Sequence, residues 1–307
     1  MVDNASTDGT AESVRGLGVG ATVIEAGENL GFAAGCNRGA DTASGELLVF
    51  LNPDAVPDQG FRDAIERPLL EDRGWSAWQG LVTAEVGRVV NTRGGMLHFT
   101  GIAWAGGAGE PVAEGPAPSE PGFVSGACLA IPRGAFERAE GFPEEFFLYH
   151  EDVDLSLRLR LAGGRLGVEA AARVDHDYEF AKGAAKWRYL ERNRWATLVR
   201  TYPGALLALL APALLATELA LVPISIAGGW LPQKLRAWGD AVRALPRLLR
   251  ERRRIQATRA TSAGGFARAL TPDLGSPYLG AAARSRPLRA LLRAYWSVVL
   301  RLLGSTS

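Results

Sequence analysis

The sequence contains few of the residues that build disulfide frameworks and metal clusters. Its 307 residues include two cysteines and three histidines. Cys36 and Cys128 lie far apart among small or apolar residues, and no CxxC or Cys/His cluster is present. This argues against zinc and against a disulfide, and predicts two buried thiols in a reducing, cytosolic compartment. No signal-peptide pattern is visible, because the N-terminal residues are polar almost from the start.

Acidic residues are scarce in the C-terminal part of the chain. Residues 182–307 hold 5 Asp and Glu against 21 Lys and Arg, a net charge of +16. Residues 1–181 hold 28 Asp and Glu against 13 Lys and Arg, a net charge of −15. Such asymmetry indicates two parts with different partners. The acidic part suits metal-bridged phosphates and the basic, apolar part suits anionic lipid, whereas no nucleic-acid-binding motif accompanies the basic residues.

The order of the predicted elements favours a layered α/β sheet. The run from Glu46 to Leu51 is nearly continuously apolar and ends at Asn-Pro-Asp, which is typical of a buried parallel strand. Ligands of such sheets bind at the carboxyl ends of the strands, where Asp3 and Asp54 would lie. Helices are further predicted at residues 9–16, 31–43, 58–70, 153–162 (packed on both faces) and 182–202, a strand at 21–25 and an irregular excursion at 86–122.

Residues 204–229 form a long apolar run that Pro212, Glu218 and Pro223 interrupt. The run approaches the roughly 20 residues that span a bilayer, but two spans would need about 40. Basic residues flank both sides, contrary to the positive-inside tendency for one span. A re-entrant or in-plane element is therefore favoured over one spanning helix. A buried helical pair at the subunit interface of a homo-oligomer is a third interpretation.

Residues 284–303 predict a basic amphipathic helix. Its arginines lie mostly off a wide apolar stripe made of Leu288, Leu291, Leu292, Tyr295, Val298, Val299, Leu302 and Leu303. Such a helix suits an anionic membrane surface, and packing on the protein is the alternative. Together with the apolar run and the net charge of +16, it predicts peripheral, re-entrant or single-span attachment to the cytoplasmic face of the cell membrane.

Three polar motifs occur in the first 54 residues. Asp3-Asn4-Ala5-Ser6-Thr7-Asp8-Gly9-Thr10 could bind a base and ribose, although such residues also cap helices. The glycine-rich stretch from Asn29 to Gly39 could approach a phosphate at a helix N-terminus or allow tight helix packing. Asn52-Pro53-Asp54 could hold a divalent cation after a strand, or form a proline turn with a solvated acid.

A fourth motif places Glu151, Asp152 and Asp154 directly after an aromatic cluster, at the start of a predicted helix. A helix N-terminus favours ionised carboxylates, so a base at this position is expected to stay deprotonated at neutral pH. Capping alone would explain one acid. Three acids beside an apolar wall indicate a site.

In this order, the four motifs resemble those of the family 2 glycosyltransferases with the GT-A fold. The resemblance is closest to the rhamnosyltransferase-like branch that builds bacterial cell-surface polysaccharides, and it covers about residues 2–200. The stretch Gly126 to Arg133 and the pair Arg192-Asn193 also match. The resemblance implies a mixed α/β sheet with helices on both faces for a catalytic domain at 1–200, followed by a helical membrane-associating region at 201–307.

The resemblance further implies inverting transfer from a nucleotide-diphosphate sugar, such as dTDP-rhamnose, to a hydroxyl of a lipid-linked or polysaccharide acceptor. In the Glu151-Asp152 motif, Asp152 would take the hydroxyl proton. Mg²⁺ or Mn²⁺ on Asp54, with His176 as a further metal ligand or phosphate contact, would stabilise the leaving diphosphate. Acceptor-side residues would be Gly126 and Arg133. Nucleotide-sugar contacts are implied for Asp3, Asn4, Ser6, Asn29, Gly31, Asn37 and Asp54.

The chain departs from the family at its N-terminus, where it enters the acidic turn at Asp3 without the family's first strand. This predicts an unpaired sheet edge and weak donor binding. It also predicts a natural gene product that starts upstream, so that a form extended in frame would bind donor better. A catalytically silent scaffold of the same fold is one alternative. A sugar-phosphate nucleotidylyltransferase is another, although the Gly-rich, Arg/Lys-bearing loop of those enzymes is not seen.

Overall fold

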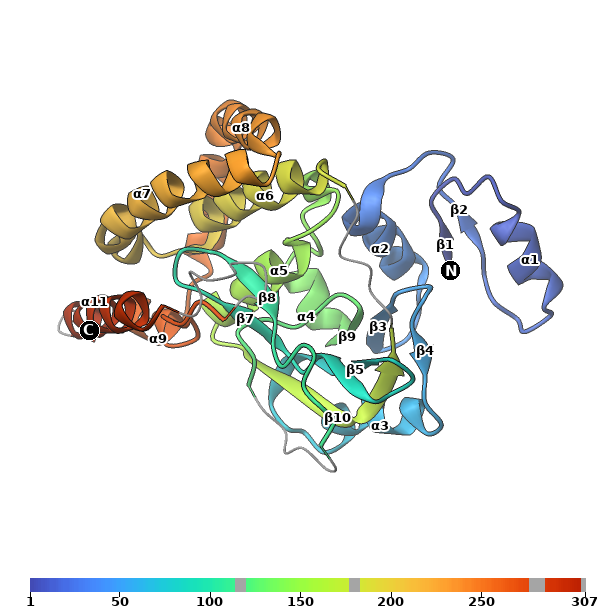
Figure 1. Ribbon diagram of the computed structural model, residues 1–307. Helices are drawn as coiled ribbons and strands as arrows, with labels where there is room; N and C mark the ends of the chain where they lie inside the picture. Colours follow the sequence, from blue (N-terminus) through green and yellow to red (C-terminus); the bar gives the residue numbers. More distant parts are fainter. Residues whose placement is uncertain (114–119, 177–182, 276–284, 305–307) are drawn as a thin grey trace.

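A mixed β-sheet lies at the centre of the computed structural model, which describes residues 1–113, 120–176, 183–275 and 285–304 (Figure 1). The β5–β10 pair is parallel and the other pairs of this sheet are antiparallel. β6 (Val89–Thr92) pairs with β5 outside the main strand order. That order is β3 (Leu47–Leu51), β9 (Cys128–Pro132), β5 (Trp75–Ala84), β10 (Arg165–Asp175) and β4 (Val56–Pro57).

Helices cover both faces of this sheet, because successive side chains of a strand point to opposite faces. On β9, Leu129 and Ile131 join a core with α2 (Gly31–Thr42), α4 (Arg133–Arg138) and α5 (Glu151–Leu161). Cys128 and Ala130 join the opposite core, which includes α3 (Phe61–Leu70). The predicted mixed α/β sheet with helices on both faces is therefore confirmed. Both cysteines are free thiols, as predicted, and burial raises the pKa of each to about 12.

The strand predicted at residues 46–51 is present as β3, but its predicted pairing and burial are wrong. β3 pairs antiparallel with β9, and no other described strand pairs with it. Leu48 and Phe50 are buried, whereas Val49 and Leu51 are 39% and 37% exposed. An apolar run does not report the direction of the neighbouring strand. It also does not show that β3 lies at the edge of the sheet, or that the side chains on one face of the strand are exposed.

The N-terminal unit forms a small sheet of its own. β1 (Val2–Asp3) and β2 (Ile24–Glu25) pair in parallel, and α1 (Thr10–Gly16) connects them. Among the described strands, neither pairs with the central sheet, and α2 lies between the two sheets (Figure 1). A groove of about 1020 Å³ is lined by β1, β3 and α2. The unpaired edge predicted from the sequence is therefore present in the described structure, along both β1 and β3.

The excursion predicted at residues 86–122 is only partly irregular. It contains β6 and a hairpin of β7 (Gly95–Leu97) and β8 (Ala103–Ala105), and residues 114–119 lie outside the described residues. Some of the glycines that suggested irregular structure serve close packing instead. A Cβ at Gly95 would collide with the ring of Phe123.

A layer of helices packs beside the sheet. Their buried faces share a core with α5 that includes Leu157, Leu198, Leu206, Leu210 and Trp296. The first residue of the helix predicted at 182–202 lies outside the described residues. The layer consists of α6 (Lys186–Thr201), α7 (Gly204–Ala227), α8 (Leu231–Ala257), α9 (Ala263–Ala267) and α11 (Arg286–Gly304).

The apolar run forms one continuous helix, α7, with both prolines inside it. The re-entrant interpretation is wrong for this backbone, because the helix does not turn back within residues 204–227. Within the described residues, α7 alone is long and apolar enough to cross a membrane by length and composition, and 22% of its most apolar window is buried. It contacts α8, α9 and α11, which fits an element lying along the protein.

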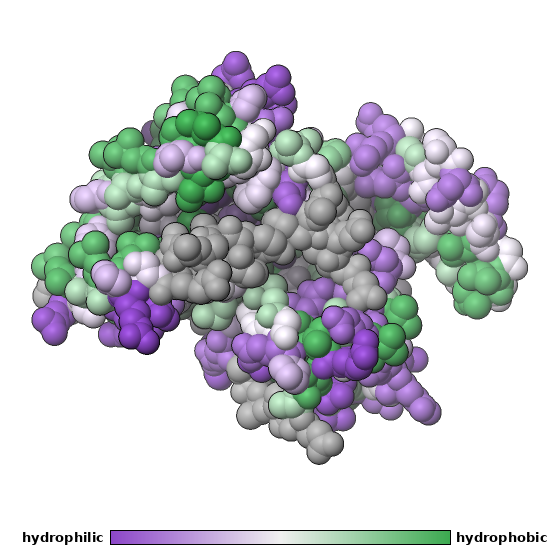
Figure 2. Space-filling model, in the orientation of Figure 1, coloured by the Kyte–Doolittle hydropathy of each residue, from purple (hydrophilic) through white to green (hydrophobic). Residues whose placement is uncertain are grey.

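The predicted amphipathic helix is α11. One part of its apolar stripe packs on the protein and another part stays exposed, so the packing interpretation and the membrane interpretation each describe one side of the helix. Trp296, Val299 and Leu303 are buried, and Trp296 stacks on Phe99 with ring centroids 4.9 Å apart. Leu291 and Val298 remain exposed. Figure 2 shows that apolar surface gathers over the C-terminal helices.

Candidate active site

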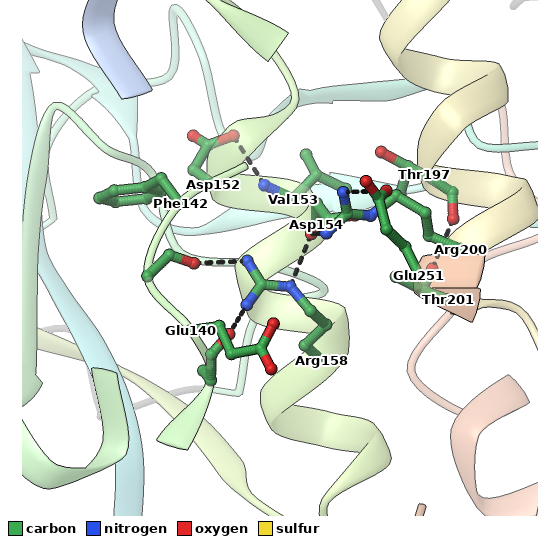
Figure 3. Close-up of polar contacts among 12 residues, drawn as sticks. Glu140, Phe142, Asp152, Val153, Asp154, Arg158, Thr197, Arg200, Thr201 and Glu251 are labelled. Carbon is green, nitrogen blue, oxygen red and sulfur yellow. Dashed lines mark hydrogen bonds and ion pairs between the residues drawn. The ribbon is translucent and has the colours of Figure 1, made fainter. Parts of the chain in front are cut away.

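Glu151 and Asp152 are the first two residues of α5 and line a cavity of about 490 Å³. The Asp152 carboxylate accepts two backbone hydrogen bonds. Its Oδ2 lies 3.0 Å from the nitrogen of Gly126. Its Oδ1 lies 2.8 Å from the nitrogen of Val153 (Figure 3). These two bonds hold the carboxylate in one orientation at the wall of the cavity.

Burial changes the acidity of both carboxyl groups. Burial raises the pKa of Asp152, and the N–H groups of Gly126 and Val153 act in the opposite direction. For Glu151, burial and then the charge of Asp152 raise the pKa well above its usual range. Within the described residues, Glu151 Oε2 is buried without a hydrogen-bond partner. Glu151 is therefore the group that keeps its proton and Asp152 the group that ionises, although burial opposes the expected effect of the helix N-terminus.

Asp154, the third acid of the motif, is not part of the cavity. It is buried and pairs with Arg158 at 2.6 Å and with Arg200 at 3.0 Å. Arg200 in turn pairs with Glu251 at 2.8 Å, so this network joins α5, α6 and α8. Asp152 points away from the network (Figure 3). Only two of the three acids thus belong to the site, because the helix directs the third into the protein interior.

The loop before α5 is strained and tightly held. Phe147, Tyr149 and His150 all have positive φ, between 63° and 69°, which is costly for residues with a side chain. The amide nitrogen of Asn193 lies 3.0, 2.9 and 2.7 Å from the carbonyl oxygens of Phe146, Leu148 and Tyr149. Arg192 donates to the Phe146 carbonyl as well and to Asn193 Oδ1. The Arg192-Asn193 pair therefore positions the loop that carries Glu151 and Asp152.

We expect Asn193→Asp to lower both stability and turnover. The substitution keeps the shape of the side chain but turns a carboxylate oxygen towards three carbonyl oxygens. Leaving such buried groups unsatisfied costs about 1–3 kcal/mol, and the strained loop would relax and displace Asp152. Thermal unfolding and kcat check this. Gln256→Glu, on α8, is the matched control, because Gln256 donates to a single carbonyl, that of Thr201. An Asn193→Asp protein that is less stable but turns over normally would contradict the positioning role.

The amide side chains of the first two motifs bind the protein's own backbone. Asn4 accepts from the nitrogen of Leu30 at 3.1 Å and donates to the carbonyl of Gly31 at 2.9 Å. Asn29 accepts from the nitrogen of Gly31 at 3.0 Å. Asn37 pairs with both backbone groups of Phe142 at 2.9 Å. These contacts position α2, and donor binding by these three residues stays a prediction.

The glycine-rich helix start serves packing, and Gly31 also lines the groove beside β1 and β3, so a phosphate contact there stays a prediction. The nitrogens of Phe32 and Ala33 donate to the carbonyl of Phe147 at 2.7 and 3.4 Å. Gly31 has φ +81°, and a Cβ there would lie 2.5 Å from that same carbonyl oxygen. Of the two interpretations of this motif, tight packing therefore describes the structure, because a protein carbonyl satisfies the first N–H groups of α2.

Asp3 and Ser6 lie at the end of β1. Asp3 is buried, and its Oδ2 accepts from the nitrogen of Ser6 at 3.2 Å. In the described part of the chain, Asp3 Oδ1 is buried and has no hydrogen-bond partner. The Ser6 residue is exposed. An acceptor left unsatisfied at the end of a strand is suited to a hydroxyl or amine of a ligand.

The two residues predicted to bind metal meet, although 122 positions separate them. Asp54 Oδ1 lies 3.0 Å from Nε2 of His176, and Asn52 Nδ2 lies 3.4 Å from the same nitrogen. The Asp54 side chain is 63% exposed and that of His176 is buried. One carboxylate and one imidazole fit a divalent cation that takes its other ligands from a diphosphate and water. The described residues contain no cluster of three or more Asp, Glu, His or Cys that could hold a metal by itself.

Of the two residues predicted on the acceptor side, neither lines the cavity, and only Gly126 contacts a residue that does. Its nitrogen donates to Asp152, and a Cβ there would lie 3.0 Å from the ring of Phe32. Arg133 instead donates to three carbonyl oxygens around the end of α2, those of Gly45, Ala40 and Ala43. Its guanidinium joins α4 to α2 and is not among the residues that line the cavity.

Sequence reasoning missed most of the cavity wall. Asn91 and Thr92 of β6 lie in this wall with the carboxylates, and Trp104, Trp187 and Trp230 add aromatic surface. The three tryptophans come from β8, from α6 and from the junction of α7 and α8. Their only signal in the sequence is their residue type, because they are scattered over more than 120 positions.

The first residues of the chain match a known family. Residues 1–78, which include β1, α2 and the Asp54 turn, match the sequence model of Glycosyl transferase family 2. The matched residues carry the sequence pattern of a family 2 glycosyltransferase domain. The sequence resemblance to that family is thereby confirmed, and the acidic pair of this glycosyltransferase lies beyond the matched residues.

Two relatives of this glycosyltransferase are named as rhamnosyltransferases. The chain is 28% identical over 227 residues to the N-acetylglucosaminyl-diphospho-decaprenol L-rhamnosyltransferase of Mycobacterium tuberculosis, covering 65% of this chain and 72% of the relative. It is 36% identical over 83 residues to the rhamnosyltransferase WbbL of Escherichia coli, covering 24% of this chain and 31% of that protein.

Solved structures share the fold of this glycosyltransferase. GalNAc-T7 with UDP, GalNAc and Mn²⁺ superposes with a TM-score of 0.53 at 15% identity, over 68% of this chain and 43% of that one. TarS of S. aureus superposes with a TM-score of 0.52 at 14% identity, over 99% of this chain and 48% of that one. This chain thus spans less than half the length of either protein.

Proposed function

We propose that this glycosyltransferase transfers a sugar from a nucleotide-diphosphate donor to a hydroxyl of a lipid-linked cell-envelope glycan, with inversion. The observation that supports this most is the Glu151–Asp152 pair in a cavity whose wall includes the apolar helix α7. dTDP-rhamnose is the first candidate donor, because both relatives described above are rhamnosyltransferases. A lipid-linked acceptor accords with the Mycobacterium tuberculosis relative, whose name specifies a diphospho-decaprenol.

Asp152 acts as the base. An acceptor hydroxyl in the cavity gives its proton to the Asp152 carboxylate while its oxygen forms a bond to the anomeric carbon of the donor. The bond from that carbon to the diphosphate breaks on the opposite face, so the configuration inverts. Glu151, which keeps its proton, is available to donate a hydrogen bond inside the same cavity.

Asp54 and His176 would hold Mg²⁺ or Mn²⁺, because their side chains converge at the carboxyl end of β3. When bound, the cation would stabilise the charge of the leaving diphosphate. Asp3 would accept a hydrogen bond from the base or ribose through its unsatisfied oxygen. These assignments place the donor between the N-terminal unit and the acidic pair.

Residues 1–200 would form the catalytic domain and residues 201–307 the membrane-associating region. α7 would lie in the membrane plane at the cytoplasmic face, because one side of it packs on the protein and the other is apolar and exposed. The basic residues of α8 and α11 would face anionic lipid headgroups.

We expect this protein to release dTDP from dTDP-rhamnose slowly without acceptor and only with Mg²⁺ or Mn²⁺. UDP- and GDP-sugars tested in parallel identify the preferred donor, and chelation should abolish release. Asp54→Asn should raise the cation concentration needed by at least about tenfold, because one charged ligand of a weakly bound ion is lost. Asp58→Asn, at an exposed acid four residues further along the chain, is the control. Failure to cleave any nucleotide sugar, with either cation, would refute the proposed function.

A further inference from the structure

The cavity beside Asp152 has two chemically different walls. Asn91, Thr92 and Ser125 lie in the wall with the two carboxylates. The other wall is apolar and includes Leu221 and Ile224 from the C-terminal half of α7. Trp187 and Trp230 complete it as a stacked pair, with ring centroids 4.6 Å apart. A hydroxyl nucleophile needs the first wall, but a sugar alone does not account for the second.

The apolar wall is continuous with the exposed face of α7. Ile224 lines the cavity and is also 38% exposed, so it lies at the cavity mouth. Leu215, Leu219 and Ile226 lie on the side of α7 opposite Ile224 and are each more than half exposed. The exposed Ala220 and Pro223 join the two sides. An apolar chain could therefore pass from the surroundings of α7 into the cavity without crossing polar surface.

The one acid of α7 does not interrupt this path. Glu218 turns towards the protein, where its carboxylate pairs with Arg194 and, at 2.8 Å, with Lys234. The indole nitrogen of Trp238 donates to the same carboxylate at 2.8 Å. The charge is neutralised on the inner side of the helix, and the outer side remains apolar.

We propose that this cavity binds the proximal part of the apolar chain of a lipid-linked acceptor, between the tryptophan pair and Ile224. This inference rests on the proposed function, because the acceptor sugar must reach Asp152. A cavity of about 490 Å³ is of the size that holds a small molecule. The diphosphate that links the sugar to the chain would lie between Asp152 and the apolar wall. The remainder of the chain stays in the bilayer beside α7.

Binding of the chain can be measured without glycosyl transfer. Geranyl diphosphate, added in detergent-free buffer, should saturably change the tryptophan fluorescence of the full chain, and inorganic diphosphate should not. Decyl diphosphate distinguishes a branched isoprenoid chain from a straight one, and binding of either supports the inference. Ile224→Asp should weaken binding at least about tenfold, because it places a charge in the apolar wall.

The matched control is Ile226→Asp, on the same helix but outside the cavity lining. It should bind geranyl diphosphate as the unchanged protein does, and thermal unfolding shows whether both variants fold. Equal weakening by the two substitutions, or no binding by the unchanged protein, would overturn the inference.

A second measurement separates this inference from the proposed function. Two acceptors with the same N-acetylglucosaminyl diphosphate, one with a geranyl and one with a methyl group, are compared under transfer conditions. The geranyl acceptor should show a KM at least about tenfold lower, and Ile224→Asp should remove that difference. Transfer with equal KM for both acceptors overturns the inference alone. Geranyl diphosphate binding by a protein that cleaves no nucleotide sugar overturns the proposed function alone.

Discussion

Asp152→Asn is expected to lower kcat by about 10²–10⁴-fold, which is the usual contribution of a positioned general base. Donor affinity should be unchanged. Asn keeps the shape of the side chain, but its single carbonyl oxygen can accept only one of the two backbone hydrogen bonds, because Gly126 and Val153 donate to different oxygens of Asp152. It cannot take the proton of the acceptor hydroxyl. Turnover with acceptor and equilibrium binding of dTDP-rhamnose measure the two quantities separately.

Glu151→Gln is the matched control for that variant. Because the pKa of Glu151 is raised well above its usual range, Gln resembles the protonated side chain that the cavity already contains. We expect most of kcat to remain. A larger loss in Glu151→Gln than in Asp152→Asn would make Glu151 the base. No loss in either variant would mean that neither residue is the base, whereas no turnover by the unchanged protein would support the silent scaffold.

The pH dependence follows from the same two groups. Burial raises the pKa of Asp152, so kcat/KM should fall, as pH is lowered, at a pH above the ordinary Asp value of about 3.9. Glu151→Gln should leave this acid limb in place, because burial raises the pKa of Glu151 well above its usual range and Asp152 is the proposed base. An acid limb that moves with the Glu151→Gln substitution would mean that Glu151 is charged in that range.

Lys234→Met is expected to lower the free energy of unfolding by about 3–5 kcal/mol, because it leaves buried carboxylates short of a cation. Lys234 is fully buried and lies 2.5 Å from Glu191 and 2.8 Å from Glu218. Arg194 contacts the same two acids. The four charges join α6, α7 and α8 next to the cavity, so the whole helical layer depends on them.

A double variant tests whether charge balance is the cause. Glu218→Gln together with Lys234→Met removes one charge of each sign and leaves the Glu191–Arg194 pair. It should be more stable than Lys234→Met alone, as a coupled pair requires. Chemical unfolding of the single and double variants gives the coupling energy. If the two single substitutions lower the free energy of unfolding additively, the charges of Glu218 and Lys234 are not coupled.

The same network has a pH signature. Burial acts to raise the pKa of Glu191, but Arg194 and Lys234 outweigh it, so the pKa is lowered. A lowered carboxyl pKa contributes stability that is present above the ordinary Glu value of about 4.3 and is lost as pH falls through the folded pKa. Lys234→Met should reduce this acid-dependent loss.

Much of the local structure follows from local sequence patterns. The glycine-rich stretch, the apolar run at 46–51 and the helical pattern at 153–162 each predict an element that is present as α2, β3 or α5. The order of the four motifs was enough to identify the family and to place the acidic pair at the start of a helix. Periodicity, capping preferences and turn residues act within a few positions of the chain, and a sequence displays them directly.

Tertiary structure decided which of those residues belong together. It brought Asp54 to His176 across 122 positions, turned Asp154 away from Asp152, and took Arg133 to the end of α2. It also made Asn193 the support of a strained loop. The physical reason is that these contacts depend on how separate elements pack. Packing is set by side-chain shape and by burial over the whole molecule, which no short stretch of sequence contains.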